Sequence, residues 1–231
     1  MNNSIIVMKN IKYIFFITIA AFVLSSCGLD NYDAPQSRLH GKITYNGETL
    51  GLRGTGEAVR LQLYQDGYEL RDNIQVFVGQ DGTFEALLFD GEYKLVTRNQ
   101  NGPWVNTRDT IVVNLKGSTE VEVKVTPFFT ISNETITLNG SVLNASLNVN
   151  KIVSTADIDY VTLMVSKTAF VDDVSNIARE DFSGLQAGSH SLSMDMSGNA
   201  NVASAKALFA RVGVRTIGAD QAIYSDIVRL K

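Results

Sequence analysis

The sequence predicts an all-β protein of two consecutive antiparallel β-sandwich domains that follow a lipoprotein signal peptide. Three observations predict this fold class. Apolar and polar residues alternate with a period of two, which is typical of half-buried strands. Glycine-containing turns end these runs about every ten residues, the spacing of short antiparallel strands. No long run in the first domain follows the helical period, which argues against a sheet built from βαβ units.

The first 26 residues have the order of a lipoprotein signal peptide. Lys9 and Lys12 form a positive region, and residues 14–24 form an apolar region of the expected length. Residues 24–26 (LSS) then precede Cys27, as in a lipobox. We therefore expect Cys27 to be lipidated and to anchor the protein in a membrane. The alternative is a transmembrane helix, but the apolar run is shorter than the roughly 20 residues that a helix needs to span a bilayer.

An acidic tether, residues 27–37, connects Cys27 to the folded part of the chain. A polar segment of this kind holds a domain away from the bilayer. Asp30 and Asp33 also resemble the export signal that sends Bacteroidetes lipoproteins to the outer face of the outer membrane. We expect an outer-membrane lipoprotein exposed at the cell surface, with the periplasmic face as the alternative location.

Composition excludes several classes of function. Cys27 is the only cysteine, so the chain has no intrachain disulfide, zinc–thiolate cluster or cysteine nucleophile. The net charge is −4, and removal of Lys9 and Lys12 with the signal peptide makes it more negative. An acidic chain lacks the basic stripes that bind nucleic acid, so we expect no nucleic-acid partner. Attachment to the outer membrane then depends on the N-terminal lipid.

The first β-sandwich is expected over residues 38–126. Its strands are predicted at residues 39–45, 59–63, 74–78, 83–88, 93–97, 111–115 and 121–125. Asn46 and Gly47 are a strong signal for a two-residue hairpin turn. Pro127 follows the last strand and cannot donate a hydrogen bond to a sheet, so we place the domain boundary at Thr126 and Pro127.

The second β-sandwich is expected over residues 127–231. Its strands are predicted at residues 128–131, 135–138, 141–149, 161–165, 192–196, 208–214 and 223–230. Residues 172–182 have a mixed period and are predicted as a loop with a helical turn, and residues 203–210 could begin as a short helix. This pattern is typical of an immunoglobulin-like or fibronectin-III-like sandwich. Residues 209–212 (FARV) and 223–225 (IYS) resemble the last hairpin of a fibronectin type III module.

The residues of both domains carry resemblances to known families. The first domain resembles the carboxypeptidase-regulatory-like, transthyretin-like sandwich at residues 41–45 (GKITY), 59–61 (VRL), 81–84 (DGTF) and 91–95 (GEYKL). That resemblance implies that the Tyr93 ring packs into the core. Residues 30–35 (DNYDAP), 61–68 (LQLYQDGY), 102–106 (GPWVN) and 210–214 (ARVGV) recur in this order in a family of two-domain Bacteroidetes lipoproteins of unknown function. This resemblance implies a two-domain β lipoprotein associated with starch-utilisation-type transporters, and it implies no catalytic residues.

No catalytic, metal or cofactor site is expected from the residues themselves. His40 and His190 lie in different predicted domains, whereas a hydrolytic zinc site needs three protein ligands. Asp172 and Asp173 lie in a predicted loop and are expected to be solvated. Glycosidase chemistry needs two carboxylates that face each other across a cleft, which two small sandwiches rarely enclose. We expect a protein that is not an enzyme, and a cryptic glycoside hydrolase is the less favoured alternative.

The remaining candidate is a carbohydrate-binding surface around the single tryptophan. An exposed Trp104 could stack on a sugar ring, and the predicted surface consists of Trp104, Asn106, Tyr64 and Tyr68. Alternatively, Trp104 fills the end of the first sandwich or its contact with the second. We expect an accessory lipoprotein that binds oligosaccharide or assembles with an outer-membrane transporter complex. The alternative is a structural spacer or protein-docking module.

Overall fold

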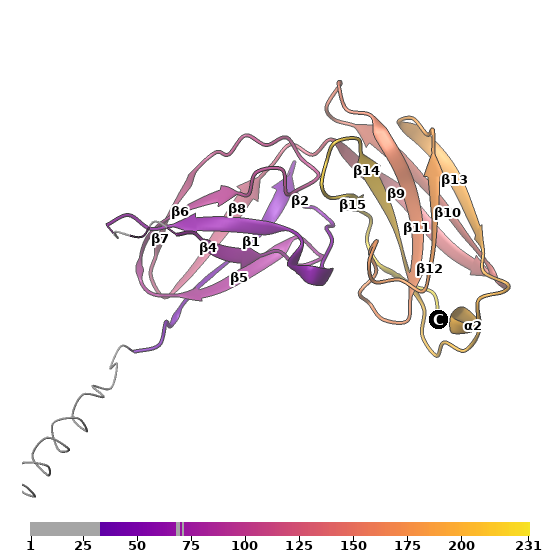
Figure 1. The fold of residues 1–231 in the computed structure, drawn as a ribbon, viewed down its shortest axis with the longest axis horizontal. Helices are drawn as coiled ribbons and strands as arrows, with labels where there is room; N and C mark the ends of the chain where they lie inside the picture. The colour runs from indigo at the N-terminus through magenta and orange to yellow at the C-terminus, as the bar shows by residue number, and fades with distance from the viewer. Residues whose placement is uncertain (1–32, 68–69, 71) are drawn as a thin grey trace, which may run out of the picture. The chain divides into compact units, whose positions relative to one another are not determined.

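The alternating residues of the first half of the chain form two facing sheets (Figure 1). The computed structural model describes residues 33–231 except 68, 69 and 71, so the predicted signal peptide and Cys27 lie outside the described residues. One sheet contains β1 (Ser37–Tyr45), β2 (Glu48–Thr49), β5 (Thr83–Leu88) and β8 (Ser118–Lys124). The other has the order β4 (Ile74–Phe77), β3 (Arg60–Tyr64), β6 (Gly91–Thr97) and β7 (Ile111–Leu115). Their inward-facing side chains, among them Leu39, Ile43, Leu61 and Tyr93, are buried.

One strand pair of this first sandwich departs from the predicted antiparallel arrangement. β8 pairs with β1 in parallel, whereas β5 pairs with β1 antiparallel. The reason is that β7 and β8 belong to different sheets, so the turn at Gly117 carries the chain across the sandwich. After this crossing, β8 runs beside β1 in the same direction.

The second half of the chain forms another pair of sheets. The first has the order β13 (Gly188–Asp195), β10 (Val142–Lys151) and β9 (Phe129–Asn139). The second has the order β12 (Ala178–Ser183), β11 (Ile158–Ser166), β14 (Phe209–Thr216) and β15 (Ile223–Tyr224), and β16 (Val228–Arg229) also pairs with β14. Apolar side chains from both sheets fill the space between them, among them Leu143, Leu147, Leu163 and Val212. The predicted all-β fold of two sandwiches is confirmed.

Two local predictions in this second sandwich are wrong. Residues 172–182 were expected to form a loop with a helical turn, but β12 occupies the second half of this segment and pairs with β11. β12 is an edge strand with Arg179, Glu180 and Asp181 in succession, and this run of charges hides its period of two. The sequence suggested that a short helix could begin at residue 203, but the helix α2 (Ala200–Ala203) ends there. It begins at Ala200 because the Asn199 side chain caps it by accepting from the amides of Asn201 and Val202.

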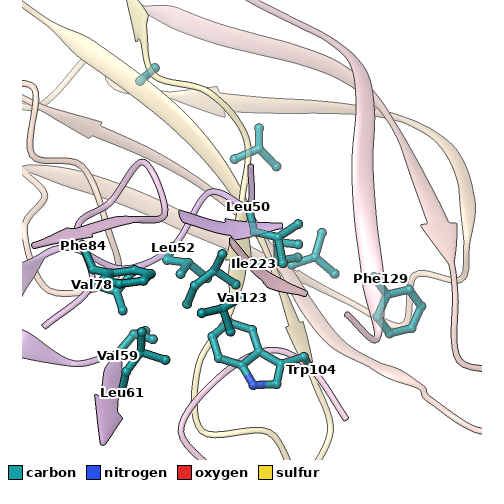
Figure 2. Close-up of a cluster of buried hydrophobic side chains, with 14 of the residues drawn as sticks. Leu50, Leu52, Val59, Leu61, Val78, Phe84, Trp104, Val123, Phe129 and Ile223 are labelled. Atoms are coloured by element: carbon teal, nitrogen blue, oxygen red, sulfur yellow. The ribbon is translucent and has the colours of Figure 1, made fainter. Parts of the chain in front are cut away.

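A single apolar cluster extends through both sandwiches (Figure 2). Leu50 and Leu52, from the segment after β2, belong to this cluster, and Leu50 lies beside Ile223 of β15. Val123 lies beside Trp104 in the same cluster. Residues 35–231 accordingly form one compact unit. No helix in the described part of the chain is both long enough and apolar enough to cross a membrane.

Candidate functional site

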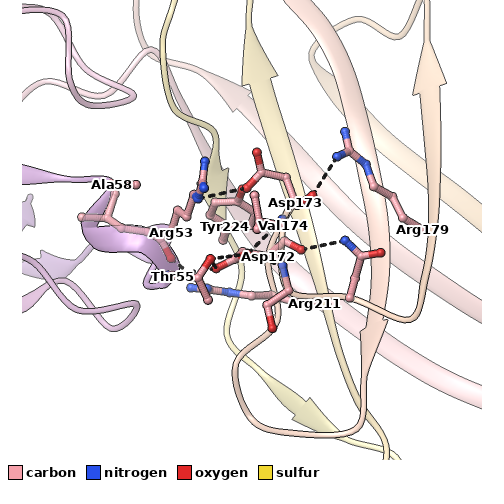
Figure 3. A network of polar contacts seen from close by, with 12 residues as sticks. Arg53, Thr55, Ala58, Asp172, Asp173, Val174, Arg179, Arg211 and Tyr224 are labelled. Atoms are coloured by element: carbon pink, nitrogen blue, oxygen red, sulfur yellow. Dashed lines mark hydrogen bonds and ion pairs between the residues drawn. The ribbon is translucent and has the colours of Figure 1, made fainter.

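A buried arginine joins the two sandwiches (Figure 3). Arg211 lies on β14 and is only 2% exposed. Its Nη1 donates to the Leu52 carbonyl at 2.8 Å and its Nη2 to the Gln80 carbonyl at 2.9 Å, both in the first sandwich. Its Nε donates to the Ser225 carbonyl at 2.6 Å in the second. The guanidinium also lies 4.8 Å from the centre of the Tyr224 ring, a favourable cation–π distance.

Backbone pairing beside Arg211 connects the same two sandwiches. Gly51 and Tyr224 form an antiparallel bridge, in which the Tyr224 amide donates to the Gly51 carbonyl at 3.0 Å. A Cβ atom at position 51 would lie 2.3 Å from the Tyr224 carbonyl oxygen and 2.7 Å from Arg211 Nη2. Only glycine therefore permits this close approach of the two backbones.

Two aspartates of the loop before β12, Asp172 and Asp173, complete this contact between the sandwiches. We call the contact formed by Gly51, Asp172, Asp173, Arg211 and Tyr224 the junction. Asp172 is fully buried and accepts hydrogen bonds from the Thr55 hydroxyl at 2.7 Å, the Ser175 amide at 2.8 Å and the Val174 amide at 3.0 Å. Asp173 accepts from the Tyr224 hydroxyl at 3.0 Å. The prediction that Asp172 is solvated is therefore wrong, because its loop packs against the first sandwich and its carboxylate binds the donors there.

The junction holds its groups in defined charge states. Burial alone would raise the pKa of Asp172, but the hydrogen bonds from Ser175, Thr55 and Val174 outweigh it and lower that pKa below the usual value. Burial lowers the pKa of Arg211 to about 10, so the guanidinium remains charged at neutral pH. Burial, together with the charge of Asp173, raises the pKa of Tyr224, so its phenol stays a neutral donor.

We expect Asp172→Asn to lower the free energy of unfolding at neutral pH by about 1–3 kcal/mol, because the amide cannot accept all of these bonds. The folded-state pKa of Asp172 is below 3.8, so its stabilisation is complete above that value and is lost as the pH falls through the folded pKa. The difference between the wild type and the variant should therefore shrink below about pH 4. Urea denaturation across this pH range measures it.

Asp159→Asn is the matched control, because Asp159 is an exposed aspartate on β11. The free energy of unfolding of this variant should stay within about 0.5 kcal/mol of the wild-type value. An Asp172→Asn variant as stable as the wild type at neutral pH would contradict the role assigned to the Asp172 carboxylate.

An open cleft of about 380 Å³ adjoins the junction and shares Gly51 and Tyr224 with it. One wall is the hairpin of β1 and β2, and the other comes from β9 and from residues 223–226. The hairpin turns at Asn46 and Gly47, whose φ angles of 52° and 87° are those of a type I′ turn, as the sequence predicted. The polar side chains that line the cleft include Tyr45, Asn46, Glu48, Glu134 and Asp226.

Glu134 reaches the cleft because β9 contains a β-bulge. Ser132 pairs with Asn148 and Thr135 pairs with Ser146, so two residues of β9 lie opposite the single residue between them on β10. The first of these is Asn133, with a φ of 53°. An extra residue reverses the alternation of side chains along a strand. Glu134 consequently lines the cleft, while Asn133 lines a hollow elsewhere on the same sheet.

Trp104 is not the exposed stacking surface that the sequence suggested. Its side chain is 4% exposed and its backbone bridges to Pro127, the first residue predicted for the second sandwich. A Cβ atom at Gly102 would lie 2.2 Å from two atoms of the indole ring, so the ring packs directly on this glycine. The position of Trp104 agrees with the alternative stated above, in which the ring fills the contact between the first sandwich and the second.

The other predicted carbohydrate-binding residues do not gather at one place. Asn106 is exposed and donates a hydrogen bond to the Asn99 side chain. Tyr64 is half-buried on β3, where its hydroxyl donates to Gln62 at 3.4 Å. Tyr68 lies outside the described residues. The lining of the cleft includes neither Asn106 nor Tyr64, and sequence reasoning did not single out the residues that do line it.

Two family models match the chain. The N-terminal domain of a protein of unknown function, DUF3823, matches residues 37–126, and the domain of unknown function DUF3823_C matches residues 129–229. The chain belongs to the DUF3823 family. The resemblance to a two-domain Bacteroidetes family of unknown function is thus confirmed.

Solved structures of other DUF3823 proteins share this fold. One from Parabacteroides merdae is 62% identical, with a TM-score of 0.84 over 86% of this chain and 100% of that chain. One from Bacteroides ovatus is 30% identical, with a TM-score of 0.75 over 84% and 98%.

A third protein shows the fold at lower identity. This protein, from Bacteroides uniformis, is called a "putative carbohydrate binding protein" and is 18% identical, with a TM-score of 0.72 over 85% of this chain and 99% of that chain. A comparison with curated proteins finds no match. Within the described residues, no group of three histidine, cysteine or acidic side chains is arranged to hold a metal ion.

Proposed function

We propose that this DUF3823 protein is a non-enzymatic, cell-surface lipoprotein of the outer membrane that binds oligosaccharide in the cleft between its sandwiches. Lipidation of Cys27 would anchor it, and it would serve as an accessory component of a starch-utilisation-type uptake system. The cleft carries the proposal, because both sandwiches contribute polar side chains to one open cavity of about 380 Å³. Cavities of this size, with a few convergent polar groups, are typical of small-ligand sites.

The lining of the cleft suits the chemistry of a sugar. A pyranose ring has C–H faces that pack against an aromatic ring, and Tyr45 offers a half-buried ring at the end of β1. Sugar hydroxyls donate well to carboxylates, since charge-assisted hydrogen bonds are the stronger ones. In the described part of the chain, the carboxylates of Glu48, Glu134 and Asp226 form no hydrogen bond or ion pair. Their acceptor capacity is therefore available to a ligand.

The junction supports the proposal by fixing the two walls of the cleft. Arg211 and the bridge between Gly51 and Tyr224 hold the sandwiches together directly beside the cavity. A site with walls that are already in place loses less conformational entropy when it binds a ligand. The description of the Bacteroides uniformis protein as carbohydrate-binding agrees with this proposal.

Docking to the transporter is a second candidate function, favoured by two apolar side chains at the end of β5. Leu87 is 60% exposed and Phe89, two residues later, is 50% exposed. Exposed apolar side chains that lie close together often mark protein contacts. This function does not exclude the first, because the assembly component and the glycan-binding component of an uptake system can be one protein.

We expect calorimetry against a panel of neutral oligosaccharides to detect binding that Tyr45→Ala weakens by about tenfold or more. The reason is that this change removes the ring from the cleft while leaving the junction intact. Glu134→Gln should weaken binding less, since its amide keeps one acceptor. Tyr64→Ala is the matched control, because Tyr64 is another half-buried strand tyrosine of the first sandwich outside the cleft. Absence of binding to every sugar at millimolar concentration would remove the carbohydrate proposal and leave docking.

A further inference from the structure

Three consecutive rows on the outer face of the sheet β13-β10-β9 consist of uncharged polar side chains, and Asp195 lies one row beyond them on β13. Each of three rows takes one residue from each strand: Ser193, Asn144 and Thr137; Ser191, Ser146 and Thr135; Ser189, Asn148 and Ser132. The outer face of the first sandwich differs, because its β1, β5 and β8 carry charged side chains that include Arg38, Glu85 and Glu120. The three rows therefore differ from the charged outer face of β1, β5 and β8.

We call the surface formed by these three rows the neutral face. The neutral face and the cleft meet on β9. Thr130 lines the cleft, and Asn150 Nδ2 donates to its hydroxyl at 3.3 Å and to the Ser132 hydroxyl at 2.9 Å. Asn133, at the bulge, lines a hollow of about 360 Å³ on the neutral face. The hollow begins only three residues after Thr130, or about 10 Å along the strand. One strand therefore supplies both the edge of the cleft and the edge of the array.

We infer that the ligand is an uncharged polysaccharide chain, one part of which occupies the cleft while the rest crosses β9 onto the neutral face. This inference rests on the proposed function, since it extends the same site. It names the substrate class as a neutral glycan of several units, not a single sugar or an anionic glycan.

The side-chain chemistry of the face supports a neutral, hydroxyl-rich ligand. Serine and threonine hydroxyls rotate and can both donate and accept, and asparagine amides do both as well, so they match sugar hydroxyls of either role. A ligand bound here need not desolvate an ionised side chain, which would be costly. On β10 and β13 the rows follow one another every two residues, and neighbouring strands lie about 4.8 Å apart, which suits a ligand whose polar groups also repeat. Glu48, Glu134 and Asp226 in the cleft would repel uronate or sulfate groups.

Chain length is the variable that tests the inference. We would compare disaccharides and hexasaccharides derived from xylan, β-glucan, α-glucan and galactan, with oligogalacturonide as the anionic probe. For a glycan that binds, the hexasaccharide should bind on the order of tenfold tighter than the disaccharide. Ser146→Glu, which puts a charge in the middle row, should abolish this advantage and leave disaccharide affinity unchanged. Ser183→Glu, on the exposed edge strand β12, is the matched control and should change neither.

The outcomes separate this inference from the proposed function. If neither length binds, the proposed function fails. If the disaccharide binds and the hexasaccharide binds no tighter, only the inference is overturned. Equal affinity for oligogalacturonide would overturn the neutral substrate class. If sedimentation shows that Ser146→Glu changes the oligomeric state, the face is instead a contact between copies of the chain, and the inference is overturned. Ser146→Ala removes only the hydroxyl and should keep the fold with a smaller loss of hexasaccharide affinity, so misfolding of Ser146→Glu leaves the inference testable.

Discussion

Arg211→Ala is expected to lower the free energy of unfolding by about 3–5 kcal/mol, because it removes the donor to two buried carbonyls and to a third that is partly buried. These are the carbonyls of Leu52, Gln80 and Ser225. The Gln80 carbonyl keeps the Leu52 amide as a donor, so only the Leu52 and Ser225 carbonyls lose the partner that Arg211 supplies without such a replacement. A buried carbonyl left without a partner costs about 1–3 kcal/mol, and the truncation also leaves a cavity. Because the loss falls at the contact between the sandwiches, calorimetry should show two unfolding transitions in the variant and one in the wild type.

Two further variants separate the guanidinium from the effects of charge and position. Arg215→Ala changes a half-exposed arginine on the same strand and should cost no more than about 0.5 kcal/mol. Arg211→Lys keeps a positive charge but loses the planar fork of donors, so it should recover little of the stability. A single transition at the wild-type temperature in Arg211→Ala would show that the apolar cluster alone holds the sandwiches together.

The regular part of the fold follows from the sequence because each strand buries one face. β8 shows this clearly, with Val121 and Val123 buried between the exposed charged residues Glu120, Glu122 and Lys124. Asn46 and Gly47 likewise fixed the first hairpin, since a type I′ turn needs positive φ at both central residues. These signals are local, and each can be read from a few neighbouring residues.

The junction and the cleft are not local, so the sequence alone did not reveal them. Arg211 stands in an ordinary alternation, where a charged residue normally faces water, but the first sandwich covers that side of β14. The bulge in β9 made one strand look like two short runs, and it reversed the direction of Glu134. Residues such as Tyr45 and Asp226 are distant in the chain and meet only in the folded protein.

Trp104→Ala is expected to lower the free energy of unfolding by about 3–5 kcal/mol, the usual cost of truncating a buried tryptophan. The indole packs on Gly102 and lies in the apolar cluster near Val123, so its removal leaves a large cavity at the contact between the sandwiches. Urea denaturation measures the loss. Phe89→Ala is the control, because Phe89 is 50% exposed and its removal should cost far less.

The position of Trp104 can also be tested without destabilising the protein, since it is the only tryptophan in the chain. Acrylamide should quench its fluorescence poorly in the native state and strongly after unfolding in urea, because the folded protein shields the ring from solvent. Trp104→Phe keeps most of the apolar volume and does not alter the lining of the cleft, so it should fold and retain the glycan affinity of the wild type. A folded Trp104→Phe variant that no longer binds sugar would instead mean that the indole stacks on the ligand, and the glycan site would then have to lie at the 102–106 loop.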